Sequence, residues 1–202
     1  AGLKAFAPLY SADDVAACLG FLRETRYCDW NDLGGGNGFR FWDARHIVGS
    51  ASVELKLAGQ RLLFSGDIGG GSAIHCSDSE LGGYDQIICE ATYGNRAREP
   101  VLISERREQL ATYVEETLNR NGNLLIPAFA VERTQVVLED LVALFESGRL
   151  RPFNVFVDSP LAERVTRATQ RHRHAGYDLL SVPNIRFIHD VEESKKLNSM
   201  NG

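Results

Sequence analysis

Two residues that can bind a metal ion, His46 and Asp67, flank a segment with the pattern of a β-hairpin. An imidazole nitrogen and a carboxylate oxygen are both common zinc ligands. If the hairpin turn centres near Gly59, residue 51 faces residue 67, and the IVGS segment can fold back to bring the His46 ring beside the carboxylate. A packed loop histidine and a turn aspartate explain the same two residues, so both interpretations stay open at this point.

The segments around this pair are predicted to be mostly β-structure. In SVELKLAGQRLLFSGD, residues 52–67, apolar and polar residues alternate, which is typical of half-buried strands joined by a tight turn, here at residues 58–60. We further predict a helix over 12–24 with Ser11 as its N-cap, a loop or hairpin tip over 34–38, and a buried strand over 84–92.

After Pro100, predicted strands and helices alternate. Buried strands are expected at NLLIPAF (123–129), FNVFVDS (153–159) and NIRFIHD (184–190), with helices over 104–120 and 131–148, a helix beginning at Pro160 and capped by Ser159, and a last helix beginning at Val191. Such alternation with short links is typical of a parallel sheet flanked by helices, so the fold class is α/β. We place the boundary between the two regions at 96/97.

The composition is that of an ordinary globular domain. The chain has 202 residues, a formal net charge of −5 and 44% hydrophobic residues, with no apolar run long enough to span a membrane and no signal-peptide pattern at its start. None of the four cysteines forms a C-x-x-C pair, so a cysteine zinc site is not expected. We expect reduced thiols, a buried Cys89 and a cytoplasmic location.

Three places are candidates for contact with phosphate. Arg133 and Thr134 follow a predicted strand and open a helix, and Ser159 lies at a second strand-to-helix corner. From Arg149 to His174 there are six arginines but only two acidic residues, which suits either a solvated helix face or a phosphate-facing surface. No G-x-S-x-G or G-x-G-x-x-G pattern in the right context supports a serine hydrolase or a dinucleotide site.

Several blocks in sequence order resemble one family. DARHIVGSASVELKL, LLFSGDIG, ICEATYGNR, LLIPAFAVERTQ and VFVDSPLA, followed by EESKKLN, are similar to the β-CASP branch of the metallo-β-lactamase superfamily, and especially to its RNA-processing nucleases. The resemblance covers nearly the whole chain. It implies that residues 1–96 form part of a metallo-β-lactamase αββα domain and residues 97–202 part of a β-CASP domain.

The resemblance implies roles for three residues. His46 matches a motif that supplies a ligand to one zinc ion, and Asp67 matches the carboxylate that bridges two zinc ions at the catalytic centre. Glu90 matches the first β-CASP motif, an acid that orients a downstream general-acid histidine. In that family, two zinc ions activate water for in-line attack on a phosphodiester, which would make single-stranded RNA the partner and substrate.

The sequence also departs from the family pattern. The His-x-His-x-Asp-His cluster does not occur in these residues, and the resemblance places it before Ala1 and two further histidine motifs after Gly202. We therefore expect the chain to be an internal part of a longer nuclease, inactive by itself and weak in zinc binding. The family usually has glycine in place of Arg45 and histidine in place of Arg98.

Two other functions fit the same resemblance. One is a non-catalytic β-CASP scaffold or RNA-binding subunit, and the other is a DNA-directed repair nuclease. The presence of His46, Asp67 and Glu90 together favours the nuclease, because a scaffold has no need of all three. A homodimer is a candidate assembly, and no membrane partner is expected.

Overall fold

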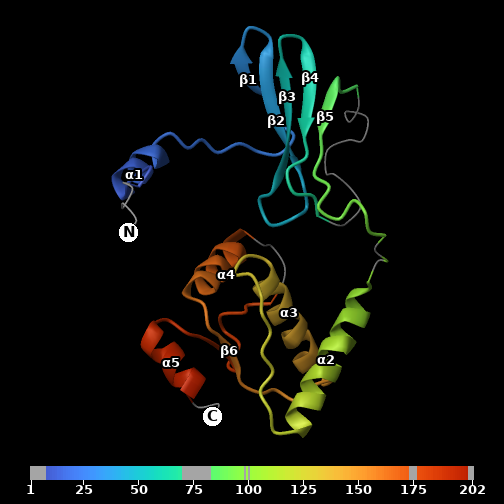
Figure 1. Cartoon of the computed structure of the whole chain (residues 1–202), viewed down its shortest axis with the longest axis vertical. Helices are drawn as coiled ribbons and strands as arrows, with labels where there is room; N and C mark the ends of the chain where they lie inside the picture. The colour runs from blue at the N-terminus through green and yellow to red at the C-terminus, as the bar shows by residue number, and fades with distance from the viewer. Residues whose placement is uncertain (1–7, 70–82, 98, 100, 173–176, 200–202) are drawn as a thin grey trace, which may run out of the picture. The chain divides into compact units, whose positions relative to one another are not determined.

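A computed structural model describes residues 8–69, 83–97, 99, 101–172 and 177–199 (Figure 1). The chain divides between Glu90 and Ala91 into two compact units, whereas the boundary predicted from the sequence lies between residues 96 and 97. The first unit carries a five-stranded sheet, and the second combines helices with a two-stranded parallel sheet. The α/β class predicted from the sequence is confirmed.

The strands of the first sheet lie in the order in which they occur in the chain. The first four pair antiparallel, and the fifth runs parallel to the fourth. Their bounds are β1 Asn31–Gly34, β2 Asn37–Asp43, β3 Ala51–Leu57, β4 Gln60–Phe64 and β5 Gln86–Ile88. Of the glycines expected at the hairpin tip, Gly35 and Gly36 connect β1 and β2, while Gly34 ends β1 and Gly38 lies in β2; Gly34, Gly35 and Gly36 all have positive φ angles.

The predicted β3–β4 hairpin is confirmed, with a change of register. Leu57 pairs with Gln60, so the turn contains two residues, Ala58 and Gly59, whose φ angles of 50° and 82° suit a tight hairpin turn. The sequence predicted a three-residue turn that places residue 51 opposite residue 67. The shorter turn moves this pairing by one residue, and Gly66 lies against the carbonyl of Ala51.

The helix of the first unit, α1 (Ala12–Leu19), is shorter than the predicted helix. Its N-terminus is as predicted, because the Ser11 hydroxyl accepts a hydrogen bond from Asp14 N and the Asp14 carboxylate accepts one from Ser11 N. Helical structure ends at Gly20 instead of reaching residue 24. None of its residues is buried, so no packing offsets the cost of extending a helix through glycine.

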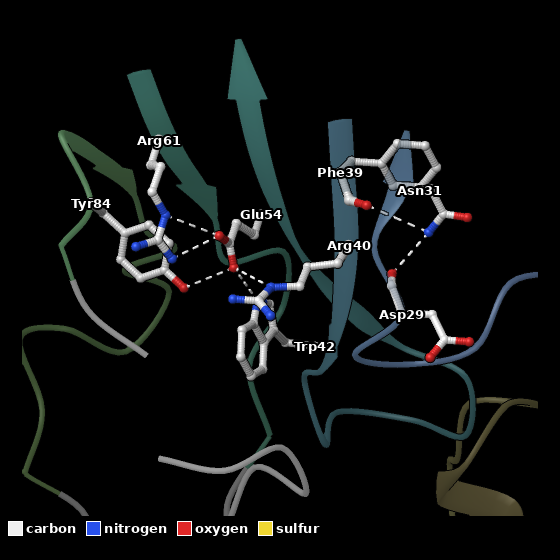
Figure 2. Close-up of polar contacts among 8 residues, drawn as sticks. All are labelled: Asp29, Asn31, Phe39, Arg40, Trp42, Glu54, Arg61 and Tyr84. Carbon is white, nitrogen blue, oxygen red and sulfur yellow. Dashed lines mark hydrogen bonds and ion pairs between the residues drawn. The ribbon is translucent and has the colours of Figure 1, made fainter. Parts of the chain in front are cut away.

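A buried carboxylate ties the sheet together (Figure 2). Glu54 of β3 is only 2% exposed, and Arg40 and Arg61 reach it from opposite sides at 2.7 and 2.8 Å. The indole N–H of Trp42 and the hydroxyl of Tyr84 also donate to it, at 2.9 and 3.3 Å. Burial raises the pKa of Glu54, but the hydrogen bonds from the two arginines and the indole outweigh burial and hold this pKa below its ordinary value.

The second unit forms around two parallel strands and four helices among its described residues. Their bounds are α2 Ile103–Asn119, α3 Arg133–Glu146, β6 Val155–Val157, α4 Pro160–His172, β7 Ile185–Phe187 and α5 Val191–Ser199. Apolar side chains from α3, β6, α4, β7 and the segment before β7 form one core cluster, which contains Leu138, Val142, Val157, Ala162, Leu179 and Ile185. The predicted strands at β6 and β7 and all four predicted helices are confirmed.

Two predicted buried strands differ in the structure. Residues 123–129 contain no strand, and Leu125 and Phe129 are 87% and 80% exposed. β5 is shorter than predicted, and Ile87 is 61% exposed because no described residues cover this strand. A strand needs a neighbouring strand to complete its backbone hydrogen bonds. No described strand pairs with residues 123–129 in a sheet.

The cysteines also differ from expectation. Cys18 and Cys89 are free, but Cys89 is exposed rather than buried, because it lies just after the uncovered strand β5. Cys28 is disulfide-bonded, which contradicts the expectation that all four thiols are reduced.

A second buried carboxylate, Asp140 of α3, joins this helix to α2. It accepts hydrogen bonds from Arg106 at 2.6 Å and from Arg107 at 2.9 Å. Burial raises the pKa of Asp140, but these hydrogen bonds outweigh it and hold the pKa below the ordinary value of 3.8. The carboxylate therefore stabilises the fold in its charged form.

Replacing Asp140 with asparagine should lower the free energy of unfolding by about 2 kcal/mol at neutral pH, because hydrogen bonds between charged groups are lost. The partial exposure of both arginines limits this loss. The stabilisation by Asp140 is fully present above pH 3.8 and is lost as the pH falls through its lowered pKa. Urea denaturation between pH 7 and pH 2 should therefore show the two proteins converging in acid. Glu116→Gln, in an exposed pair, is the control. A difference that stays constant with pH contradicts the assignment.

Candidate functional site

The loop that carries His46 and the turn that carries Asp67 lie against each other. Gly69 N donates a hydrogen bond to the carbonyl of Ala44 at 2.9 Å. A Cβ atom at residue 69 would come within 1.5 Å of the carbonyl oxygen of Arg45, so only glycine permits this approach. The structure thus brings the two candidate metal ligands onto adjoining backbone segments at one end of the β3–β4 hairpin.

The His46 loop is closed by its own hydrogen bonds. The Ser50 hydroxyl accepts hydrogen bonds from the backbone of His46 at 3.0 Å and of Ile47 at 3.2 Å, while Ala44 N donates to the carbonyl of Ser50. The imidazole itself is on an exposed residue. These bonds hold the backbone of His46 while leaving its ring available to a ligand.

Arg45, in the same loop, has a φ angle of 54°. This left-handed conformation favours glycine, the residue that the resemblance leads one to expect here. Arg45 N donates a hydrogen bond to the Asp43 carboxylate at 2.8 Å, which supports the conformation. The other departure from the family pattern, Arg98, lies outside the described residues.

The turn that carries Asp67 is held on both sides. Before it, the hydroxyl of Ser65 donates to the carbonyl of Gly66 at 2.7 Å. After it, Ile68 N donates to the Glu90 carboxylate at 2.8 Å. The sequence led us to expect that Glu90 orients a histidine. In the structure its carboxylate also holds the turn of Asp67, through the hydrogen bond from Ile68 N. The sequence carries one related signal, because Glu90 lies shortly after the apolar run that forms β5, the strand that pairs with β4.

The donor types at this site suit a divalent metal ion, but they are few. His46 offers a nitrogen ligand and Asp67 an oxygen ligand, both on exposed residues of adjoining loops. Within the part of the chain that the structure describes, no group of three or more His, Cys, Asp or Glu side chains is arranged to hold a metal. The weak zinc binding expected of this chain alone stays a prediction.

The other predicted contact residues lie in the second unit. Arg133 is exposed at the first turn of α3, whereas the hydroxyl of Thr134 donates to the carbonyl of Phe129 at 2.8 Å. Ser159 caps α4 by accepting a hydrogen bond from Ala162 N at 3.1 Å, as its position before Pro160 predicted. Of these three residues only Arg133 is exposed, so it offers the most accessible group for a phosphate.

Two arginines of the basic stretch form ion pairs. Arg149 binds the carboxylates of Glu108 and Glu115, whose hydrogen bonds raise the pKa of its guanidinium. Arg167 pairs with Glu163 one helical turn earlier at 2.7 Å. The charges of these two arginines are therefore balanced locally, which favours a solvated surface over a phosphate-facing one at their positions.

No helix among the described residues is both long and apolar enough to cross a membrane.

Comparison with known proteins connects the chain to ribonucleases. It is 33% identical to ribonuclease TTHA0252 of Thermus thermophilus over 96% of this chain and 47% of that protein. It is 30% identical to an RNase J-like protein of Methanocaldococcus jannaschii, over 75% of this chain and 37% of the relative. Endoribonuclease YSH1 of Yarrowia lipolytica is 29% identical over 85% of this chain and 21% of the relative.

The chain spans less than half the length of these curated relatives. No family model matches it.

Proposed function

Because the chain belongs to the β-CASP family of the metallo-β-lactamase superfamily, we propose that the protein containing it hydrolyses phosphodiester bonds in single-stranded RNA with the help of bound zinc ions. The observation that carries the proposal is the backbone contact between Gly69 and Ala44, which brings the loops of His46 and Asp67 together. Relatives named ribonucleases supply the substrate class.

His46 and Asp67 would hold metal at this site, together with ligands from outside the described residues. Bound zinc ions would lower the pKa of water and neutralise charge on the phosphate. Glu90 would keep the turn of Asp67 in place through its hydrogen bond with Ile68 N and would also support the general acid. Arg133 would contact the RNA backbone as an exposed cation at the start of a helix.

Metal removal tests the proposal. In the full-length protein, chelation followed by dialysis should reduce cleavage of a labelled single-stranded RNA by at least about a hundredfold, equal to about 2.7 kcal/mol in the barrier. Addition of zinc should restore cleavage. The same assay with single-stranded DNA of matching sequence serves as the substrate comparison and should show slower cleavage.

Three results would contradict parts of this proposal. Cleavage that survives chelation would exclude metal-dependent chemistry. Preferential cleavage of DNA would favour a repair nuclease. RNA binding without cleavage under any metal condition would favour a scaffold or RNA-binding subunit.

A further inference from the structure

A buried serine, Ser65, lies at the point where β4 leaves the sheet and the turn to Asp67 begins. It is 5% exposed. Its N–H donates to the carbonyl of Ile88 at 2.9 Å, and its own carbonyl accepts from the hydroxyl of Ser52 at 2.6 Å. The backbone of Ser65 is therefore fixed between β3 and β5, and its side chain has a defined direction.

The hydroxyl of Ser65 bridges two segments. It donates to the carbonyl of Gly66 at 2.7 Å and accepts from Glu90 N at 2.9 Å. A serine hydroxyl can donate one hydrogen bond and also accept, so Ser65 can make both bonds at once. Alanine could make neither bond.

The bridge closes a ring of contacts around Asp67. Ser65 holds the backbone of Glu90, and the Glu90 carboxylate in turn accepts from Ile68 N at 2.8 Å. Gly66 and Ile68, the two neighbours of Asp67, are thus each hydrogen-bonded to this ring. In contrast, no described residue donates a hydrogen bond to the Asp67 carboxylate. The ring constrains the backbone of Asp67 and leaves its carboxylate for a ligand.

We propose that Ser65 is a positioning residue that orients Asp67 toward bound metal by joining Glu90 to the Asp67 turn. This inference rests on the proposed function, since it assumes that Asp67 binds metal. It adds a residue to which neither the sequence motifs nor the family resemblance gave a role. Residues that orient metal ligands through hydrogen bonds commonly change metal affinity when they are replaced.

The test compares Ser65→Ala, Ser65→Thr and Ser52→Ala in the full-length protein. Ser65→Ala removes the bridge, and Ser65→Thr keeps the hydroxyl. Ser52→Ala is the matched control, because it removes a partly buried serine's hydrogen bond to the same residue but leaves the bridge intact. Zinc affinity is measured by competition with a chromophoric chelator, and amide hydrogen exchange at Ile68 is followed in metal-free protein.

We expect Ser65→Ala to weaken zinc binding by about tenfold or more and to speed exchange at Ile68. Ser65→Thr should recover most of the affinity, and Ser52→Ala should bind zinc like the wild type even if its melting temperature falls. That combination separates positioning from general destabilisation. If Ser65→Ala does not fold, Ser65→Thr decides the question. Loss of zinc affinity in Ser65→Thr, while amide exchange at Ile68 stays as slow as in the wild type, would overturn the proposal.

Two outcomes keep this inference separate from the proposed function. If wild-type protein binds zinc and cleaves RNA while Ser65→Ala has unchanged affinity and unchanged exchange at Ile68, Ser65 has no positioning role and the proposed function stands. If wild-type protein neither binds zinc nor cleaves RNA, the proposed function fails, and the role of Ser65 toward metal fails with it.

Discussion

Replacing Asp67 with alanine should reduce RNA cleavage by the full-length protein by about a thousandfold or more, equal to about 4 kcal/mol in the barrier. The carboxylate is the oxygen ligand that the site offers, and its turn is held by Ser65 and Glu90. Measurement of kcat/KM on a single-stranded RNA, with zinc affinity determined in parallel, checks the expectation. Both quantities should fall together, because the proposed role of the carboxylate is to bind metal.

The stability of Asp67→Ala should stay within about 0.5 kcal/mol of the wild type. Asp67 is exposed, and none of the described donors bonds to its carboxylate, so the fold does not depend on it. Asp29→Ala, at another exposed aspartate of the same unit, is the matched control and should retain full activity. Full activity in Asp67→Ala would remove this residue from the catalytic centre.

Replacing Glu54 with alanine should lower the free energy of unfolding by about 3 kcal/mol, the lower end of the range for breaking a buried ion pair. Removal of the carboxylate takes from Arg40 its ion pair with Glu54, and the Arg40 side chain is only 14% exposed. Arg61, at 31%, can turn toward solvent more easily, which limits the loss. Chemical denaturation of wild type and variant at neutral pH measures the difference.

The effect should depend on pH with a definite sign. Because the pKa of Glu54 is lowered in the folded state, its contribution is fully present above the ordinary value of 4.5 and is lost as the pH falls through the lowered pKa. Glu24→Ala, at an exposed glutamate, controls for the loss of a negative charge. Equal stability of the Glu54 variant and wild type at neutral pH would show that the network contributes nothing net.

Local patterns in the sequence predicted local structure well. The alternation of β3 and β4, the serine before α1 and the Ser159-Pro160 pair before α4 each depend on neighbours within a few residues. Turn chemistry was also local, since Ala58 and Gly59 adopt positive φ angles between paired strands. Even so, the turn proved one residue shorter than predicted, because register depends on the hydrogen bonds of both strands.

Structural features that depend on residues far away in the chain were predicted less well. Residues 123–129 and β5 have the apolar character of buried strands, but a strand is buried only where another segment covers it, and no described segment does so. Glu54 shows the opposite case. The alternation assigned it to the polar face of its strand, while Arg40, Trp42 and Arg61 from the neighbouring strands enclose it.

For the candidate site, the sequence by itself determined the ligand types at His46 and Asp67 and, through family motifs, the expected chemistry. Only the tertiary structure decided how these residues are held. The contact of Gly69 with Ala44 and the bridge from Ser65 to Glu90 join segments from three different parts of the chain. Such contacts have no local sequence signature, because the geometry of the assembled sheet, rather than the spacing of residues along the chain, brings their atoms within hydrogen-bonding distance.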